Sequence, residues 1–91
     1  MTPDLSIVIP AFNEQRTIRK TLQLYHDFFM NKYDFNIIVV MDGCKDQTFE
    51  IVRKISKKHP RIKYINYAKK LGKGGGIIKG FEAADGKYIA F

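Results

Sequence analysis

Short apolar runs at intervals along the chain predict the strands of a sheet. Leu5–Pro10 and Asn36–Met41 are apolar almost throughout and rich in β-branched residues, which is typical of strands buried on both faces of a parallel sheet. Ile62–Tyr67 alternates between apolar and polar residues, as a half-buried or edge strand does. Lys87–Phe91 has the composition of a fourth strand.

Between these runs the apolar residues recur at helical spacing. Asn13 is expected to cap a first helix, in which four apolar residues form one stripe that should face the core. These residues are Ile18, Leu22, Tyr25 and Phe29.

A second helix is expected from a cap at Asp46 to about Lys58. Pro60 should end it, because proline disfavours the helical conformation in the residue before it. A third helix should run from near Gly74 to about Ala84. The inner side of the second helix is expected to carry Phe49, Val52, Ile55 and Ser56.

The alternation of strands and helices predicts a single α/β domain over residues 1–91. Right-handed crossovers would give a three-layer structure, with helices on both faces of a mostly parallel sheet of strand order 3-2-1-4. Ligands of such sheets bind outside the carboxyl ends of the strands, where the strand order reverses. The residues just after Pro10 and just after Met41 are therefore the first candidates for a binding site.

Charge is distributed unevenly along the chain. Residues 1–52 carry five Lys/Arg and seven Asp/Glu, whereas residues 53–91 carry eleven and two. A basic half suits an anionic partner such as a nucleotide, a nucleic acid or an acidic membrane surface, or else is a solvated lysine-rich surface. The single cysteine, Cys44, excludes an internal disulfide and a cysteine-based zinc site. No apolar run approaches the roughly 20 residues that cross a bilayer, and no signal peptide is visible.

The glycine segment GKGGG is a candidate phosphate loop. It is not a Walker A sequence, because Lys73 is followed by Gly74 rather than by Ser or Thr, and it does not follow the G-x-G-x-x-G spacing. Consecutive glycines at a helix start expose backbone N–H groups, and Lys73 adds a positive charge, which together suit a phosphate. The alternative is close packing of the helix against the sheet, for which Gly76 and Gly80 are well placed.

Two acidic residues follow the first two strands. Asp42 precedes a glycine at the end of the second strand and could accept hydrogen bonds from a nucleobase or a ribose. Glu14 follows the first strand at a helix start, where a carboxylate also gains about 0.3–1 kcal/mol from the helix dipole, so ligand binding and helix stabilisation are both open. Asp46 is explained by its capping role. His26 and His59 have no metal-ligand spacing to each other or to a cysteine.

Three segments in order, SIVIPAFNE, VVMDGCKDQT and KKLGKGGGIIKGFEAADGKYIAF, resemble the N-terminal, nucleotide-binding half of an inverting family 2 glycosyltransferase with the Rossmann-like GT-A fold. The glycine segment is most similar to that of the dolichyl- and polyprenyl-phosphate glucose and mannose synthases, whose pattern is roughly G-K-G-G-A-x-x-x-G. Lys73, Gly74, Gly75 and Gly80 match this pattern. By the resemblance, Lys73 and Gly74 would close over the nucleotide.

The resemblance also implies a substrate and further roles. A UDP- or GDP-sugar would be the donor, with inverting transfer to a polyprenyl phosphate or a sugar hydroxyl. Pro10, Ala11 and Glu14 would line the nucleoside pocket, and Asp42 would lie near the base. A divalent cation, Mg²⁺ or Mn²⁺, would be held by an Asp-x-Asp pair after the fourth strand, and this sequence has no such pair.

The chain alone is therefore expected to be a truncated nucleotide-sugar-binding subdomain that is inactive and holds no metal. Its exposed sheet edge would favour self-association. A cytoplasmic location is expected, with a possible site at the cytoplasmic face of a membrane. A non-catalytic nucleotide- or phosphate-binding α/β module is the alternative, whereas nucleic-acid binding is disfavoured because no recognised motif is present.

Overall fold

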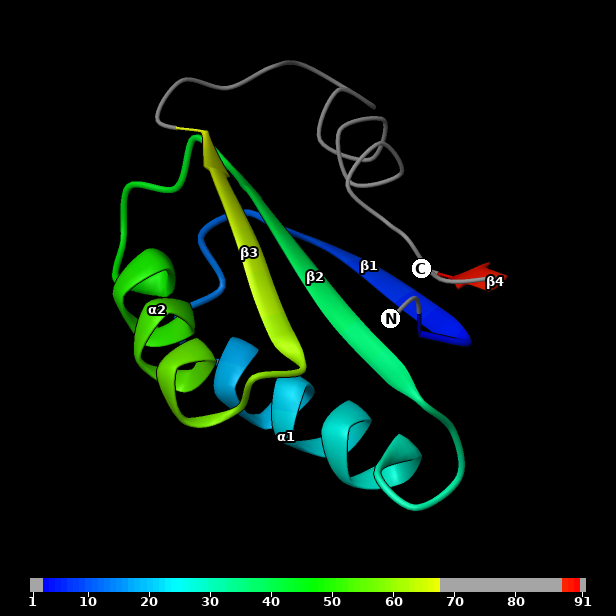
Figure 1. Cartoon of the computed structure of the whole chain (residues 1–91). Coiled ribbons are helices and arrows are strands. Elements are labelled where there is room, and N and C mark those ends of the chain that lie inside the picture. The colour runs from blue at the N-terminus through cyan, green and yellow to red at the C-terminus, as the bar shows by residue number, and fades with distance from the viewer. Residues whose placement is uncertain (1–2, 68–87, 91) are drawn as a thin grey trace.

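A computed structural model describes residues 3–67 and 88–90, and these form a parallel sheet with two helices packed on one face (Figure 1). The expected α/β architecture with a parallel sheet is confirmed. The elements are β1 (Leu5–Ala11), α1 (Ile18–Phe29), β2 (Phe35–Asp42), α2 (Thr48–Lys58), β3 (Ile62–Tyr67) and β4 (Tyr88–Ala90).

The sheet has the order β3-β2-β1-β4, and every neighbouring pair is parallel. The chain moves outward from β1 through β2 to β3, and β4 lies on the other side of β1. The register pairs Ala11 at the end of β1 with Met41 near the end of β2. The loops that follow these two strands therefore leave the sheet side by side, at the point where the strand order reverses.

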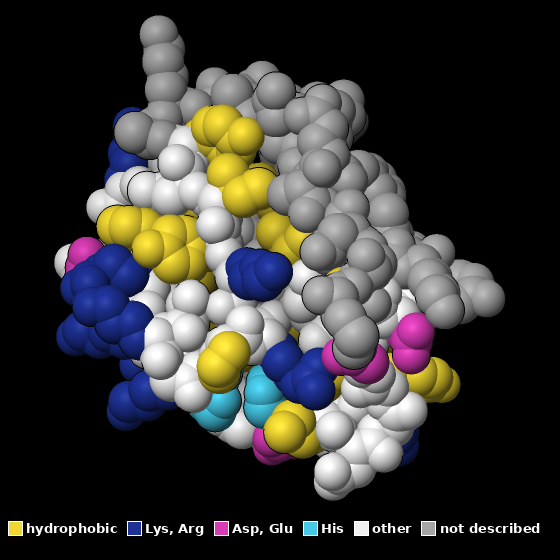
Figure 2. All heavy atoms as spheres, viewed as in Figure 1, with side chains coloured by type: hydrophobic (Ala, Val, Ile, Leu, Met, Phe, Trp, Pro, Cys, Tyr) yellow, Lys and Arg dark blue, Asp and Glu magenta, His cyan; other side chains and the backbone are white. Residues whose placement is uncertain are grey.

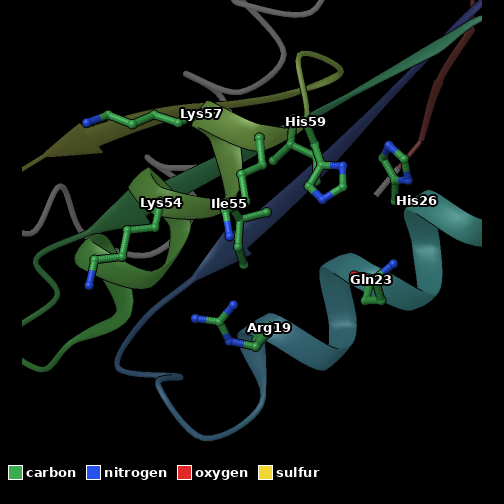
Figure 3. A pocket seen from close by; sticks show the side chains of 9 residues that line it. Arg19, Gln23, His26, Lys54, Ile55, Lys57 and His59 are labelled. Atoms are coloured by element: carbon green, nitrogen blue, oxygen red, sulfur yellow. The ribbon is translucent and has the colours of Figure 1, made fainter.

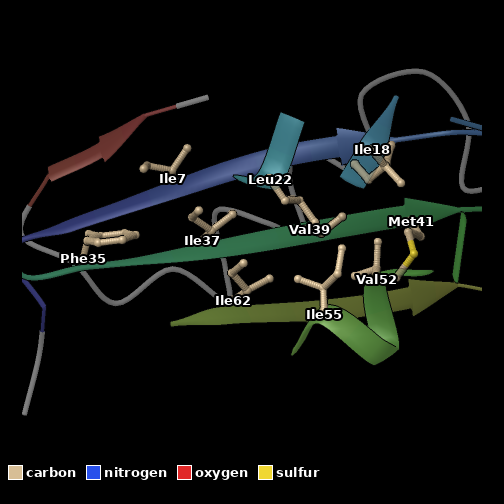
Figure 4. Close-up of a cluster of buried hydrophobic side chains, with 11 residues drawn as sticks. Ile7, Ile18, Leu22, Phe35, Ile37, Val39, Met41, Val52, Ile55 and Ile62 are labelled. Carbon is tan, nitrogen blue, oxygen red and sulfur yellow. The ribbon is translucent and has the colours of Figure 1, made fainter. Parts of the chain in front are cut away.

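The main hydrophobic core fills the space between the sheet and the two helices (Figure 4). Because successive side chains of a strand point to opposite faces, the odd-numbered residues of β1 and β2 point toward α1 and α2. Burial of each Ile, Val, Phe or Met side chain among them stabilises the fold by about 1.5–3 kcal/mol. The buried members are Ile7, Ala11, Ile18, Leu22, Phe35, Ile37, Val39, Met41, Val52, Ile55 and Ile62.

A smaller core lies on the opposite face of the sheet. Val8, Ile38 and Val40 are buried there, with Ile65 and Tyr67 of β3 packed against them. Strands buried on both faces account for the nearly continuous apolar runs of β1 and β2. The third helix expected near residues 74–84, which would cover this face, lies outside the described residues.

The apolar stripe predicted for α1 is correct except at Tyr25. Ile18 and Leu22 are fully buried, and Phe29 packs partly buried against the core. Tyr25 is 44% exposed, so its assignment to the core is wrong. In α2, Val52 and Ile55 are buried as predicted, whereas Phe49 and Ser56 are only half-buried.

The predicted helix caps also need correction. Thr17, not Asn13, occupies the N-cap position of α1, and its side chain makes no capping hydrogen bond. The N-cap position of α2 is Gln47, one residue after Asp46. Asp46 nevertheless accepts a hydrogen bond from the backbone N–H of Thr48 at 2.9 Å, so it still satisfies a donor at the start of α2. Both polar side chains serve mainly to join two loops, as described below.

The end of α2 is as predicted. The helix stops at Lys58, and His59 has an extended backbone (φ −127°, ψ 96°), as expected for the residue before a proline. β3 lies at the edge of the sheet, in keeping with its alternating pattern. No helix among the described residues is both long enough and apolar enough to cross a membrane.

Candidate functional site

The candidate site lies at the carboxyl ends of β1 and β2. It is built from the β1–α1 loop (residues 12–17) and the β2–α2 loop (residues 43–47). The two loops are about 30 residues apart in sequence, and the parallel pairing of β1 with β2 brings them together. The edge predicted for ligand binding is therefore formed by these two loops.

Side chains of each loop bind the backbone of the other. The amide oxygen Oδ1 of Asn13 accepts the N–H of Lys45 at 2.7 Å, and Oε1 of Gln15 accepts the N–H of Gln47 at 3.0 Å. In the reverse direction, Oδ2 of Asp46 accepts the N–H of Gln15 at 3.2 Å. Because these bonds run in both directions, the two loops hold each other in one geometry.

Thr48, the first residue of α2, adds a buried link between the same loops. Its hydroxyl oxygen accepts the N–H of Glu14 at 2.8 Å, and its O–H donates to Oδ1 of Asp46 at 2.5 Å. Burial raises the pKa of the Asp46 carboxyl, but the hydrogen bonds that it accepts from Thr48 and Gln15 outweigh this effect and leave the pKa below its ordinary value. The carboxylate therefore stays ionised at neutral pH and holds Thr48 in the orientation that receives Glu14.

Two loop positions adopt the left-handed backbone region. Gly43 has φ 74°, which a glycine adopts without steric cost, and its N–H donates to the carbonyl of Tyr67 at 2.8 Å. Asn13 has φ 49°, a value that asparagine tolerates better than most residues. The thiol of Cys44 donates a weak hydrogen bond to the carbonyl of Ala11 at 3.5 Å, so its observed contact is structural.

Four of the predicted site residues lie at this edge. Ala11 ends β1 and is buried, and Asp42 ends β2 and is half-buried. Pro10 is exposed and, by strand alternation, lies on the sheet face opposite the helices, as Asp42 does. Glu14 is half-buried, and its carbonyl accepts the N–H of Ile18 at 2.9 Å. Glu14 lies one turn before the start of α1, whose own first turn holds no acidic residue.

The other two predicted site residues, Lys73 and Gly74, lie outside the described residues. Within residues 3–67 and 88–90, no cluster of three or more His, Cys, Asp or Glu side chains is placed to hold a metal ion. The described part of the site therefore consists of two loops joined by hydrogen bonds, and it offers their backbone groups and the Asp42 carboxylate to a polar ligand.

Sequence reasoning missed the loop-joining roles of Asn13, Gln15 and Asp46. A run of polar residues after each of two parallel strands was the available signal, but the partners could not be assigned without the register. It also missed that His26 and His59 meet: their ring centroids lie 4.7 Å apart, although 33 positions separate them in the chain. Burial and the facing His59 lower the pKa of His26.

The sequence matches the family model described as Glycosyl transferase family 2 over residues 6–91. The chain belongs to this family. Glycosyltransferase AglD of Haloferax volcanii is 35% identical over 91 residues, which is 97% of this chain and 15% of that protein. A dolichyl-phosphate beta-glucosyltransferase of Trichomonas vaginalis is 34% identical over 90 residues, which is 92% of this chain and 27% of that protein.

Two solved structures that superpose on this chain confirm its GT-A fold. A mannosyltransferase from Pyrobaculum calidifontis, in complex with GDP-Man and Mn²⁺, superposes with a TM-score of 0.74 at 20% identity, over 92% of this chain and 25% of that one. TarS of S. aureus superposes with a TM-score of 0.77 at 22% identity, over 98% of this chain and 26% of that one. The chain spans only part of the length of its curated relatives. It covers 15% of AglD and 29% of the dolichyl-phosphate beta-glucosyltransferase of Drosophila melanogaster.

Proposed function

We propose that this family 2 chain is a nucleotide-sugar-binding subdomain and that its ligand is a UDP- or GDP-sugar. The observation that carries the proposal is the pair of mutually bonded loops at the carboxyl edge of β1 and β2, with Asp42 at the end of β2. Ligands of open α/β sheets bind at this point of strand reversal. The GDP-Man in the mannosyltransferase of the same fold supports a sugar nucleotide as the ligand class.

Each candidate residue has a role that its chemistry allows. Asp42 accepts hydrogen bonds from the nucleobase or the ribose, because an ionised carboxylate is an acceptor only. Pro10 forms a wall beside the nucleoside, and Ala11, whose side chain is buried in the core, offers only its backbone there. Glu14 is held at the same edge by its bond to Thr48.

Lys73 and Gly74 belong to the proposal through the sequence alone. A lysine beside exposed backbone N–H groups suits the diphosphate.

The reaction proposed for the whole protein is a single displacement at the anomeric carbon with inversion. The acceptor oxygen forms the new bond to that carbon while the bond to the diphosphate oxygen breaks, and the nucleoside diphosphate leaves with the electron pair. A polyprenyl phosphate is one proposed acceptor, because relatives include dolichyl-phosphate glucosyltransferases. Such an acceptor is already anionic and needs little help from a general base. A sugar hydroxyl is the other proposed acceptor, and it would need a general base to take up its proton.

A divalent cation would neutralise the leaving diphosphate in such a transfer. The described residues, 3–67 and 88–90, hold no cluster that fits that ion, and the sequence given contains no Asp-x-Asp pair. We therefore assign none of these residues to the metal, and none to catalysis.

Calorimetric titration with UDP, GDP and their sugars tests the binding proposal. Asp42→Asn should weaken binding of the preferred nucleotide by about tenfold, because a hydrogen bond to a charged group contributes about 1.5–3 kcal/mol. Asp27→Asn is the matched control, since it removes the same charge from an exposed position on α1. Equal weakening by both variants, or no binding of any nucleotide by the unaltered chain, would contradict the proposal.

Transfer of radiolabelled sugar from UDP-glucose or GDP-mannose to undecaprenyl phosphate, with Mn²⁺ present, separates the enzyme from its alternative. The 91-residue chain should bind the donor without transferring the sugar, and the complete gene product should transfer it. Binding without transfer by the complete gene product would favour a non-catalytic nucleotide-binding module.

A further inference from the structure

A second hollow lies between α1 and α2. It has a volume of about 460 Å³ and extends from Arg19, in the first turn of α1, to Ile62, the first residue of β3. His26, His59 and Ile62 lie toward the amino ends of the strands, whereas the proposed nucleotide site lies at their carboxyl ends. We call this hollow the α1–α2 pocket. Its polar lining includes Arg19, Lys54, Lys57, Lys58, His26 and His59.

The lining of the α1–α2 pocket is strongly basic. Four of its residues are Lys or Arg, two are His, and no Asp or Glu is among them. Figure 2 shows Lys and Arg side chains gathered over α2, with histidine side chains partly visible at the surface nearby. In the close-up, Arg19 of α1 and Lys54 of α2 project to the same side, while His26 and His59 face each other (Figure 3).

The acidic groups near the pocket do not neutralise it. Asp27 lies 3.9 Å from the ring of His26, but its side chain is mostly exposed. Glu50 pairs with Arg53 at 2.9 Å, and its charge also acts on Lys54 and Lys57, which leaves the pocket with more cationic than acidic groups. Within the part of the chain that the structure describes, Arg19 and the three lining lysines of α2 form no ion pair. The pocket therefore carries net positive charge.

Helix dipoles explain only part of this charge. Lys57 and Lys58 lie in the last turn of α2, where cations are favourable. Arg19 lies in the first turn of α1, where cations are unfavourable, and that turn holds no acidic residue. A bound anion would compensate the charge of Arg19 at this end of the helix.

The paired histidines point to the same ligand class. The His26 side chain is only 12% exposed, and it faces His59, the ring of Phe35 and the charges of Asp27 and Arg61. Burial and then His59 lower its pKa, because a proton on one ring repels a proton on the other. The negative charge of an anion elsewhere in the pocket would favour the protonated rings and so offset this repulsion.

We propose that the α1–α2 pocket binds a phosphate-bearing anion, with Arg19 and Lys54 as its principal cationic contacts. The ligand is either a soluble phosphorylated compound or the headgroup of an anionic lipid, which share this chemistry. This binding is separate from the proposed nucleotide site and does not depend on it.

Titration of the protein with inorganic pyrophosphate at constant ionic strength tests the proposal. Saturable binding is expected, with changes in the ring resonances of His26 and His59 by NMR. These resonances report on the α1–α2 pocket, because any pyrophosphate in the nucleotide site would lie at the opposite edge of the sheet. Saturable binding that leaves both histidine signals unchanged would overturn the proposal, as would the absence of saturable binding.

Paired charge variants separate a built site from general surface charge. The double variant Arg19→Gln/Lys54→Gln should weaken pyrophosphate binding at least about tenfold, which is the lower range for charge-assisted hydrogen bonds. The control Lys20→Gln/Lys63→Gln removes the same charge at exposed positions outside the pocket and should change binding less than about twofold. Equal weakening in both would show a diffuse electrostatic attraction and overturn the proposal.

Sedimentation with vesicles identifies the source of the phosphate. A lipid headgroup would be supported if the protein binds phosphatidylglycerol vesicles, if the double variant Arg19→Gln/Lys54→Gln does not bind them, and if pyrophosphate competes with this binding. Pyrophosphate binding without vesicle binding would support a soluble ligand. Phosphatidylcholine vesicles, which carry no net charge, are the control for apolar adsorption.

Discussion

Thr48 gives the sharpest test of how the candidate site is held together. Its side chain is fully buried, and its hydroxyl both accepts the N–H of Glu14 and donates to Asp46. Thr48→Val keeps the shape of the side chain but removes both hydrogen bonds. The variant therefore isolates the polar link between the two loops from the packing of α2 on the sheet.

The expected loss of stability follows from the polar groups that lose a hydrogen-bond partner in Thr48→Val. Asp46 is half-buried and keeps the hydrogen bonds from the backbone N–H groups of Thr48 and Gln15, so its lost bond adds little. The partly buried N–H of Glu14 loses its acceptor, which costs about 1–3 kcal/mol. We expect about 2 kcal/mol of destabilisation, from a total of about 5–14 kcal/mol for a domain of this size. The melting temperature should fall by roughly 8–16 °C.

Urea unfolding followed by circular dichroism measures this change. With an m-value of about 2 kcal/mol/M, the midpoint should fall by about 1 M at an unchanged slope. Thr17→Val is the control, because Thr17 is exposed and its side chain makes no capping hydrogen bond. A Thr48→Val variant within about 0.5 kcal/mol of the unaltered protein, or no different from Thr17→Val, would refute the reasoning.

Three further outcomes are expected. Ile37→Ala should destabilise the protein by about 2–5 kcal/mol in urea unfolding, because Ile37 is fully buried. Leu24→Ala, at a 61% exposed position, should cost less than about 0.5 kcal/mol in the same assay. Similar losses in both variants would contradict the assignment of Ile37 to the core. Gly43→Ala should cost at least about 1–2 kcal/mol in the same assay, because the φ of 74° is unfavourable for a residue with a Cβ and Gly43 is buried; a neutral result would argue against that conformation. The pKa of His26 is lowered in the fold, so its contribution to stability is complete above about pH 6.5 and declines as the pH falls through the lower folded value. In His26→Gln the urea midpoint should therefore depend less on pH between about pH 7 and pH 5. The lowered pKa of Asp46 works in a lower window: its contribution is present above about pH 3.9 and is lost as the pH falls further, so that decline should persist in His26→Gln.

The local pattern of the sequence was sufficient for the strands and for most of the core. β-Branched apolar runs predicted β1 and β2 to within one residue at each end, because side-chain alternation and burial on both faces are properties of a few consecutive residues. The end of α2 followed from Pro60 for an equally local reason. The motifs also carried the family, since their order and spacing are properties of the chain itself.

Helix burial was predicted less well, because periodicity gives a face but not what covers it. Tyr25 continues the stripe of Ile18 and Leu22 yet lies 44% exposed. The packing of α1 over the sheet decides where along the helix the buried stripe ends. The sequence alone contains no measure of that position.

The sequence by itself determined the parallel α/β class, and it proposed the edge for a ligand and Asp42 and Glu14 as candidate residues there. Only the tertiary structure decided that Asn13, Gln15 and Asp46 join the two loops, and that His26 meets His59 beside a basic pocket. The loop hydrogen bonds link residues 31 or 32 positions apart. Local propensity cannot select such partners, because they are chosen by the register of β1 against β2 and by the packing of α1 against α2.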